Sequence, residues 1–139
     1  MRVLLLGATG NLGLRLIPAL LSHSHSVIAY VRSPSKLQLL LPPTLHEEIT
    51  IVQGDATDPH AIKTAIIDNK CEAVVNTAGV AALAPWATSD LPEIFRAVIE
   101  AAREAGAERR GTTTPLRVWM LGGQGVLQYP GTGDMLSKL

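Results

Sequence analysis

The sequence predicts an α/β fold, a doubly wound parallel sheet with helices on both of its faces. Short apolar runs, typical of strands buried on both faces, alternate along the chain with helical patterns. A glycine-rich turn joins the first apolar run to the first helical pattern. About five strands are expected, and a sheet of this class would arrange them in the order 3-2-1-4-5.

Each predicted strand is a short run that is rich in aliphatic residues and bounded by turn-forming residues. The runs are Arg2–Leu6, Ser26–Val31, Ile49–Gln53, Ala73–Asn76 and Leu116–Leu121. Few residues follow the fifth run. We therefore expect a single domain over residues 1–139 whose C-terminal portion, where substrate specificity usually lies, is short or missing. The fifth strand would be an apolar edge through which two copies could associate.

The helices are predicted from apolar periodicity and from capping residues. The first spans Asn11–Ser22, is expected to continue through Pro18 with a bend, and carries one apolar stripe of Leu12, Leu16, Ala19 and Leu20. Ser33 and Asp58, each followed by proline, are expected to cap the second and third helices. These helices end before Pro42 and at about Asn69, and the third faces inward through Ile62, Ala65 and Ile66.

The fourth helix is predicted to open with a capping box of Asp90 and Glu93. It would run until Gly106, with a helical repeat of Leu91, Ile94, Phe95, Val98, Ile99 and Ala102.

Composition excludes several classes of protein. The chain is 47% hydrophobic and 17% charged, and its 12 basic residues balance 12 acidic ones, which argues against a broad nucleic-acid surface. No apolar run approaches the roughly 20 residues of a membrane-spanning helix, so no membrane partner is expected. The single cysteine, Cys71, cannot form an internal disulfide, and a cytoplasmic location is the simplest expectation.

The turn after the first strand carries three regularly spaced glycines, Gly7, Gly10 and Gly13. In a dinucleotide-binding turn, the first glycine permits a tight bend, and the second lets the backbone approach a pyrophosphate. The third lets the helix pack closely on the strand, and the N-terminus of that helix attracts the phosphates. The alternative is a tight turn without a ligand.

The end of the second strand predicts which dinucleotide is bound. An acidic residue about 20 residues after the glycines would hold the ribose 2′-hydroxyl of NAD, but Arg32 stands there and Lys36 follows one helical turn later. An arginine fork suits a 2′-phosphate, and Ser33 could add a hydroxyl and an N–H group. We therefore expect NADP(H) in preference to NAD(H). The alternative is a solvated cationic pair at a helix start.

Two further loops fall at the carboxyl ends of strands, where open α/β sheets bind ligands. Asp55, after the third strand, could accept a hydrogen bond from the adenine amino group. The small residues Thr77, Ala78 and Gly79 follow the fourth strand and would leave room for the nicotinamide ribose. Ordinary turns are the alternative for each loop.

These segments together resemble a known family, the atypical short-chain dehydrogenase/reductases. GATGNLG, VRSPSKL, GDATD and NTAG, with the late GGQGVL and PG, are similar to the NmrA-like and NAD(P)H-binding group, which includes flavin and biliverdin reductase-like members. The resemblance covers residues 1–131 and implies a Rossmann-type fold that binds NAD(P)H. It places Gly7, Thr9, Gly10, Asn11 and Leu12 at the pyrophosphate, Arg32 at the 2′-phosphate, Asp55 and Ala56 at the adenine, and Thr77, Ala78 and Gly79 at the adjoining ribose.

No catalytic residue is identified. The Tyr-x-x-x-Lys proton relay of many short-chain dehydrogenases is missing, because Tyr30 lies inside a strand and Tyr129 has Gly133 where the lysine would stand. Gln124 and Tyr129 are the polar residues that could lie near a reacting substrate. His23 and His25 lack a third ligand nearby in sequence, so no metal is expected.

The leading functional hypothesis is an NADPH-dependent oxidoreductase acting on a small carbonyl, quinone or flavin-like substrate. One alternative is a non-catalytic, NmrA-like protein that senses NADP(H) and reports to a protein partner. The other is a truncated product that folds poorly.

Overall fold

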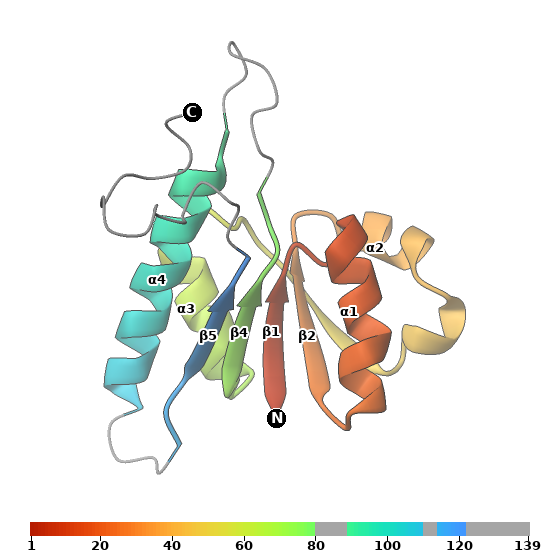
Figure 1. The fold of residues 1–139 in the computed structure, drawn as a ribbon, viewed down its shortest axis with the longest axis horizontal. Coiled ribbons are helices and arrows are strands. Elements are labelled where there is room, and N and C mark those ends of the chain that lie inside the picture. The colour runs from red at the N-terminus through yellow and green to blue at the C-terminus, as the bar shows by residue number, and fades with distance from the viewer. Residues whose placement is uncertain (80–88, 110–113, 122–139) are drawn as a thin grey trace, which may run out of the picture.

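The computed structural model of the chain describes residues 1–79, 89–109 and 114–121. The elements in chain order are β1 (Arg2–Leu6), α1 (Asn11–Ser22), β2 (Ser26–Val31), α2 (Pro34–Leu40), a short 3-10 helix (Pro43–Leu45), β3 (Ile49–Gln53), α3 (Pro59–Asp68), β4 (Ala73–Asn76), α4 (Leu91–Glu108) and β5 (Arg117–Met120). All strands pair in parallel in the order β3-β2-β1-β4-β5, as Figure 1 shows. The predicted fold class and strand order are confirmed.

The sheet lies between two hydrophobic layers, and alternate residues of each central strand serve opposite layers. Leu4 and Leu6 of β1 pack with α3 and α4, while Leu5 packs with α1 and α2 on the other face (Figure 1). Each of these three leucines is 0% exposed. Because β1 is covered on both faces, its sequence is a continuous apolar run rather than an alternating one.

Helix α1 continues through Pro18 as expected, but its buried face differs from the predicted stripe. Gly13 and Ile17 are its buried residues, whereas Leu12 is 38% exposed and Ala19 is also exposed. Gly13 is buried because the helix lies very close to the turn after β1 at this residue. A Cβ at Gly13 would lie 2.8 Å from the Ala8 Cα. Leu16 and Leu20 of the predicted stripe are partly buried and pack against the core, so the prediction is confirmed at these two positions and wrong at Leu12 and Ala19.

Helix α4 departs from the prediction at both ends. Asp90 stands at the N-cap position with helical backbone angles and makes no side-chain hydrogen bond to the first turn, so the expected capping box is not formed. Ser89 Oγ accepts from the Leu91 N–H instead. The helix also continues past Gly106 to Glu108, and Ile99, which belonged to the predicted repeat, is 56% exposed.

The other caps are confirmed. Ser33 Oγ accepts from the Lys36 N–H, and Asp58 Oδ1 accepts from the N–H groups of His60 and Ala61.

Strand β5 is the last strand at one edge of the described sheet, and its residues Val118 and Trp119 are 43% and 49% exposed. Among the described helices, none has the length and apolar character needed to cross a membrane.

Candidate functional site

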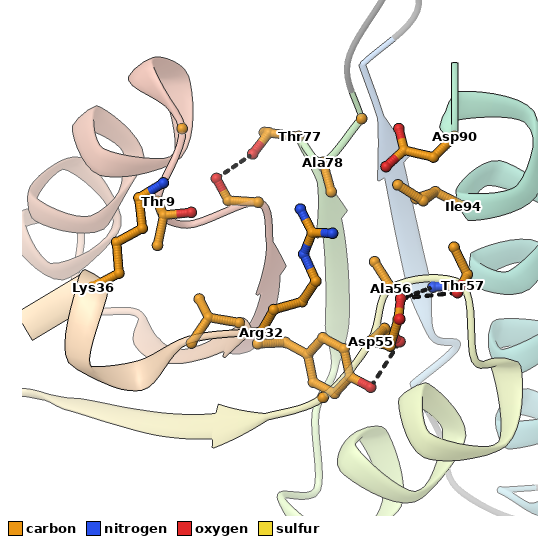
Figure 2. A pocket seen from close by; sticks show the side chains of 16 residues that line it. Thr9, Arg32, Lys36, Asp55, Ala56, Thr57, Thr77, Ala78, Asp90 and Ile94 are labelled. Carbon is orange, nitrogen blue, oxygen red and sulfur yellow. Dashed lines mark hydrogen bonds between the residues drawn. The ribbon is translucent and has the colours of Figure 1, made fainter. Parts of the chain in front are cut away.

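A cleft of about 470 Å³ opens at the carboxyl ends of β1 to β4, where the loops after these strands meet the start of α4 (Figure 2). Most of the residues predicted for the site line it: Gly7, Thr9, Gly10, Arg32, Lys36, Asp55, Ala56, Thr77, Ala78 and Gly79. Asn11, Leu12, Gly13 and Ser33 are not among its lining residues. Sequence reasoning missed Tyr30, Val31, Gly54, Thr57, Asp90 and Ile94, which also line the cleft.

The glycine turn is shaped by backbone contacts that only glycine permits. Gly7 has a φ of +79°, and a Cβ there would lie 2.5 Å from the Ala78 nitrogen. A Cβ at Gly10 would meet only the Gly7 carbonyl oxygen, at 3.3 Å, so this part of the turn is open toward the cleft. No side chain caps the N-terminus of α1, which begins at Asn11. The turn therefore offers helix N–H groups and open space to an anion.

The loop after β4 is fastened to the glycine turn. The Thr77 hydroxyl donates to the Leu6 carbonyl oxygen at 2.9 Å, with the Gly7 carbonyl oxygen 3.3 Å away. Asn76 is 0% exposed, and its Oδ1 accepts from the Ala78 N–H at 3.1 Å, while its Nδ2 has no hydrogen-bond partner among the described residues. The Thr77 hydroxyl proton is thus committed to the backbone, and this residue joins two walls of the cleft.

Two cations stand at the end of β2. Figure 2 shows the Arg32 side chain projecting into the cleft, with Asp55 on one side of it and Thr9 and Lys36 on the other. Neither Arg32 nor Lys36 forms an ion pair within the part of the chain that the structure describes. Ser33 serves as the cap of α2 and contacts Ser35 Oγ at 3.2 Å, so its hydroxyl is engaged within that helix.

The loop after β3 holds a carboxylate against its own backbone. Asp55 Oδ1 accepts from the N–H of Thr57 at 2.9 Å and from its hydroxyl at 2.8 Å. These two hydrogen bonds, aided by the positive charge of Arg32, lower the pKa of Asp55 below its usual value. Asp90 and Ile94, from the start of α4, line the same side of the cleft, and their side chains point into it in Figure 2. One side of the cleft is therefore cationic, and the other is acidic and partly apolar.

The remaining polar candidates within the described residues form no second site. Within residues 1–79, 89–109 and 114–121, no group of three side chains could hold a metal ion. His23 Nδ1 lies 2.9 Å from the Ala19 carbonyl oxygen, and His25 Nδ1 lies 3.3 Å from the chain's amino terminus. Gln124 and Tyr129, with most of the late glycine-rich segment, lie outside the described residues.

The cleft fits a nucleotide with several phosphates. The glycine turn has no room for a side chain at Gly7 and is open at Gly10, α1 begins beside it without a side-chain cap, and two exposed cations also line the cleft. A parallel sheet with such a turn at its switch point defines a Rossmann-type nucleotide-binding domain. Residues 7–115 match the protein family described as NAD(P)H-binding, and the chain belongs to this family.

Known proteins agree with this membership. The chain is 34% identical over 120 residues to a 3-diazoavenalumate denitrifying reductase of a Streptomyces species, covering 78% of this chain and 36% of that protein. It is 40% identical over 72 residues to the oxidase pynE of Aspergillus niger, covering 45% of this chain and 24% of that protein.

Among solved structures, the Bordetella bronchiseptica enzyme WbmG in complex with NAD and UDP superposes with a TM-score of 0.59 at 26% identity. This match covers 76% of the chain and 34% of WbmG. The chain thus spans about a quarter to a third of the length of these three proteins. The resemblance to atypical short-chain dehydrogenase/reductases is confirmed, and the cofactor is a nicotinamide dinucleotide.

Proposed function

We propose that the cleft binds NADPH in preference to NADH, and that the chain is the cofactor-binding part of an oxidoreductase. The observation that carries the preference is at the end of β2. Arg32 and Lys36 line the cleft there without an ion-pair partner among the described residues, and no carboxylate follows this strand. An arginine at this position can hold a 2′-phosphate by two parallel hydrogen bonds, whereas NAD needs an acidic acceptor for its ribose.

The residues of the cleft divide between the parts of the cofactor. Gly7, Thr9 and Gly10, with the main-chain N–H groups of Asn11, Leu12 and Gly13, would hold the pyrophosphate. Arg32 and Lys36, with Ser33 holding the first turn of α2, would hold the 2′-phosphate. Asp55 and Ala56 would meet the adenine, and Thr77, Ala78 and Gly79 would border a ribose.

When bound, the cofactor supplies a hydride. The described residues contribute binding and orientation rather than proton transfer. The substrate class that we propose is a small carbonyl, quinone or flavin-like molecule, with solvent as the source of the proton. The names of the two curated relatives, a reductase and an oxidase, support an oxidoreductase.

A calorimetric titration with NADPH and NADH tests the cofactor preference. Loss of the Arg32 hydrogen bonds should weaken NADPH binding by about 10- to 100-fold in Arg32→Ala, with NADH changed by no more than about twofold. Arg103→Ala is the matched control, because Arg103 is an exposed arginine of α4 that does not line the cleft. Equal binding of both nucleotides by the wild-type chain would refute the preference, and binding of neither would refute the function.

A second function is favoured by the buried, hydrogen-bonded hydroxyl of Tyr30. Its hydroxyl donates to the Asp55 carbonyl oxygen at 3.1 Å. Burial, followed by the charges of Asp58 and Asp55, raises the pKa of Tyr30 to about 12, which does not suit a proton shuttle near neutral pH. A protein with this cleft could sense NADP(H) and pass its redox state to a protein partner, as an NmrA-like regulator. NADPH oxidation with a quinone or a flavin, followed by the loss of NADPH absorbance, separates the two functions. Turnover supports the oxidoreductase, and tight binding without turnover supports the sensor.

A further inference from the structure

A buried tyrosine stands at the floor of the cleft. Tyr30 is 3% exposed and lies on the face of β2 that packs with α3 and α4. It also lines the cleft, together with Arg32 and Asp55. Arg32 stands one residue beyond the end of β2 at Val31, and it lines the same cleft as Tyr30.

The ring of Tyr30 is fitted to Gly54, at the start of the loop after β3. A Cβ at Gly54 would lie 2.6 Å from the ring carbon Cε2 and closer still to Cζ and the hydroxyl oxygen. Any side chain at position 54 would therefore push the ring away. The ring and the loop are in contact because this residue is a glycine.

The hydroxyl of Tyr30 then fixes the next residue of the loop. It donates to the Asp55 carbonyl oxygen at 3.1 Å, and the same oxygen accepts from the Asp58 N–H at 3.2 Å. Asp55 in turn binds Thr57 through its carboxylate. The hydroxyl of Tyr30 is thus attached to the turn from which α3 begins.

Two hydrogen bonds beside Tyr30, one between main-chain groups and one from a side chain, join the ends of β2 and β3. The Gly54 N–H donates to the Val31 carbonyl oxygen at 3.0 Å, and Gln53 Nε2 donates to the Arg32 carbonyl oxygen at 3.2 Å. The segment that carries Arg32 and the loop that carries Asp55 are therefore held beside each other. Tyr30 supplies the one side-chain hydroxyl among these described contacts.

A purely structural role would not need the hydroxyl. A phenylalanine would fill the same volume without the desolvation that a buried hydroxyl requires. Among the described residues, the hydrogen bond of this hydroxyl is to the Asp55 carbonyl oxygen.

We propose that Tyr30 is a positioning residue of the cofactor site, and that its hydroxyl holds the Asp55–Asp58 turn where Asp55 and Ala56 face the adenosine part of the dinucleotide. This inference rests on the proposed function, because it assigns a role within the same cleft. Tyr30 touches the loop and not the phosphate groups, so its contribution should be the same for NADPH and for NADH. This equal effect distinguishes it from Arg32.

The test compares Tyr30→Phe with Thr64→Val. The control removes a hydroxyl that donates to the His60 carbonyl oxygen at 3.0 Å on the exposed side of α3, away from the cleft. Loss of one hydrogen bond should weaken the binding of NADPH, NADH and adenosine 2′,5′-bisphosphate by about 3- to 10-fold in Tyr30→Phe, with the NADPH-to-NADH ratio unchanged. In the nucleotide-free protein, the amide hydrogens of Thr57 and Asp58 should exchange several-fold faster. Thr64→Val should change neither quantity.

Gly54→Ala disturbs the same contact from the side of the loop, because the added Cβ displaces the Tyr30 ring. It should therefore weaken the binding of all three ligands by more than Tyr30→Phe does. A wild-type chain that binds NADPH while Tyr30→Phe binds it within twofold, with unchanged amide exchange, would overturn the positioning role and leave the proposed function standing. A loss confined to NADPH would also overturn it. A wild-type chain that binds neither nucleotide would overturn both proposals.

Discussion

Replacing Gly7 by alanine should be among the most damaging single-methyl changes in this chain. The backbone φ of Gly7 is +79°, and the added Cβ would lie 2.5 Å from the Ala78 nitrogen, 2.6 Å from the Thr77 carbonyl carbon and 2.8 Å from the Ala78 Cα. An L-residue in the left-handed region costs about 1–2 kcal/mol. Relief of the overlap costs about 1–3 kcal/mol more, because the obstructing atoms are backbone. The free energy of unfolding of Gly7→Ala should therefore be lower than that of the wild type by about 2–5 kcal/mol.

The assay is urea denaturation at constant temperature, followed by circular dichroism, with Gly106→Ala as the matched control. A Cβ at Gly106 meets no atom within 4 Å, and this glycine lies inside α4. The same methyl group should therefore raise the free energy of unfolding there, by up to about 1 kcal/mol. A Gly7→Ala variant as stable as the wild type, to within about 0.5 kcal/mol, would refute the reasoning from the turn geometry.

Four further predictions concern other parts of the fold. Asp58→Ala removes the side chain that caps α3, and the free energy of unfolding in urea should fall by about 0.5–2 kcal/mol; no change would mean that this cap is not stabilising. The pKa of Asp55 is lowered in the folded chain from 3.8, so its contribution to stability is present above that value and is lost as the pH falls through the folded pKa. Asp55→Asn should lose less stability than the wild type on acidification below about pH 4, and parallel curves of stability against pH would contradict this. Burial raises the pKa of the Cys71 thiol to about 11, so a disulfide reagent at about pH 8 should react with it only after unfolding, and rapid reaction in native buffer would contradict its burial. If β5 is a site of self-association, Trp119→Lys should reduce the dimer fraction in analytical ultracentrifugation, whereas an unchanged distribution would exclude this edge.

The strands could be predicted from the sequence because their burial requires short runs of aliphatic residues, which are easy to recognise. Leu4, Leu5 and Leu6 are each 0% exposed, and a strand that is buried on both faces tolerates no polar residue in this run. The caps at Ser33 and Asp58 were also predictable, since a capping side chain followed by proline acts locally. The capping box at Asp90 was wrong because its formation depends on backbone angles that the motif does not specify.

The tertiary contacts of the cleft were less accessible to sequence reasoning. Tyr30, Asp90 and Ile94 reach it from a strand interior and from a helix that starts well beyond the recognised loops. Tyr30 had one available signal, its place near the carboxyl end of a predicted strand, two residues before Arg32 in the sequence. Asp90 and Ile94 had no such signal, because only the packing of α4 beside the sheet brings them to the cleft. Whether each lining residue binds the cofactor stays a prediction.

The hydrogen bond from the Thr77 hydroxyl to the Leu6 carbonyl oxygen affects the stage of folding at which the binding site forms. It joins residues 71 positions apart, so the cleft has no complete wall until β4 has docked beside β1. Contacts between distant parts of a chain form late, because the loop between them must first be closed. A chain emerging from the ribosome would therefore gain affinity for nucleotide only after this segment is available. The dinucleotide would then stabilise the completed centre of the sheet and none of its earlier parts.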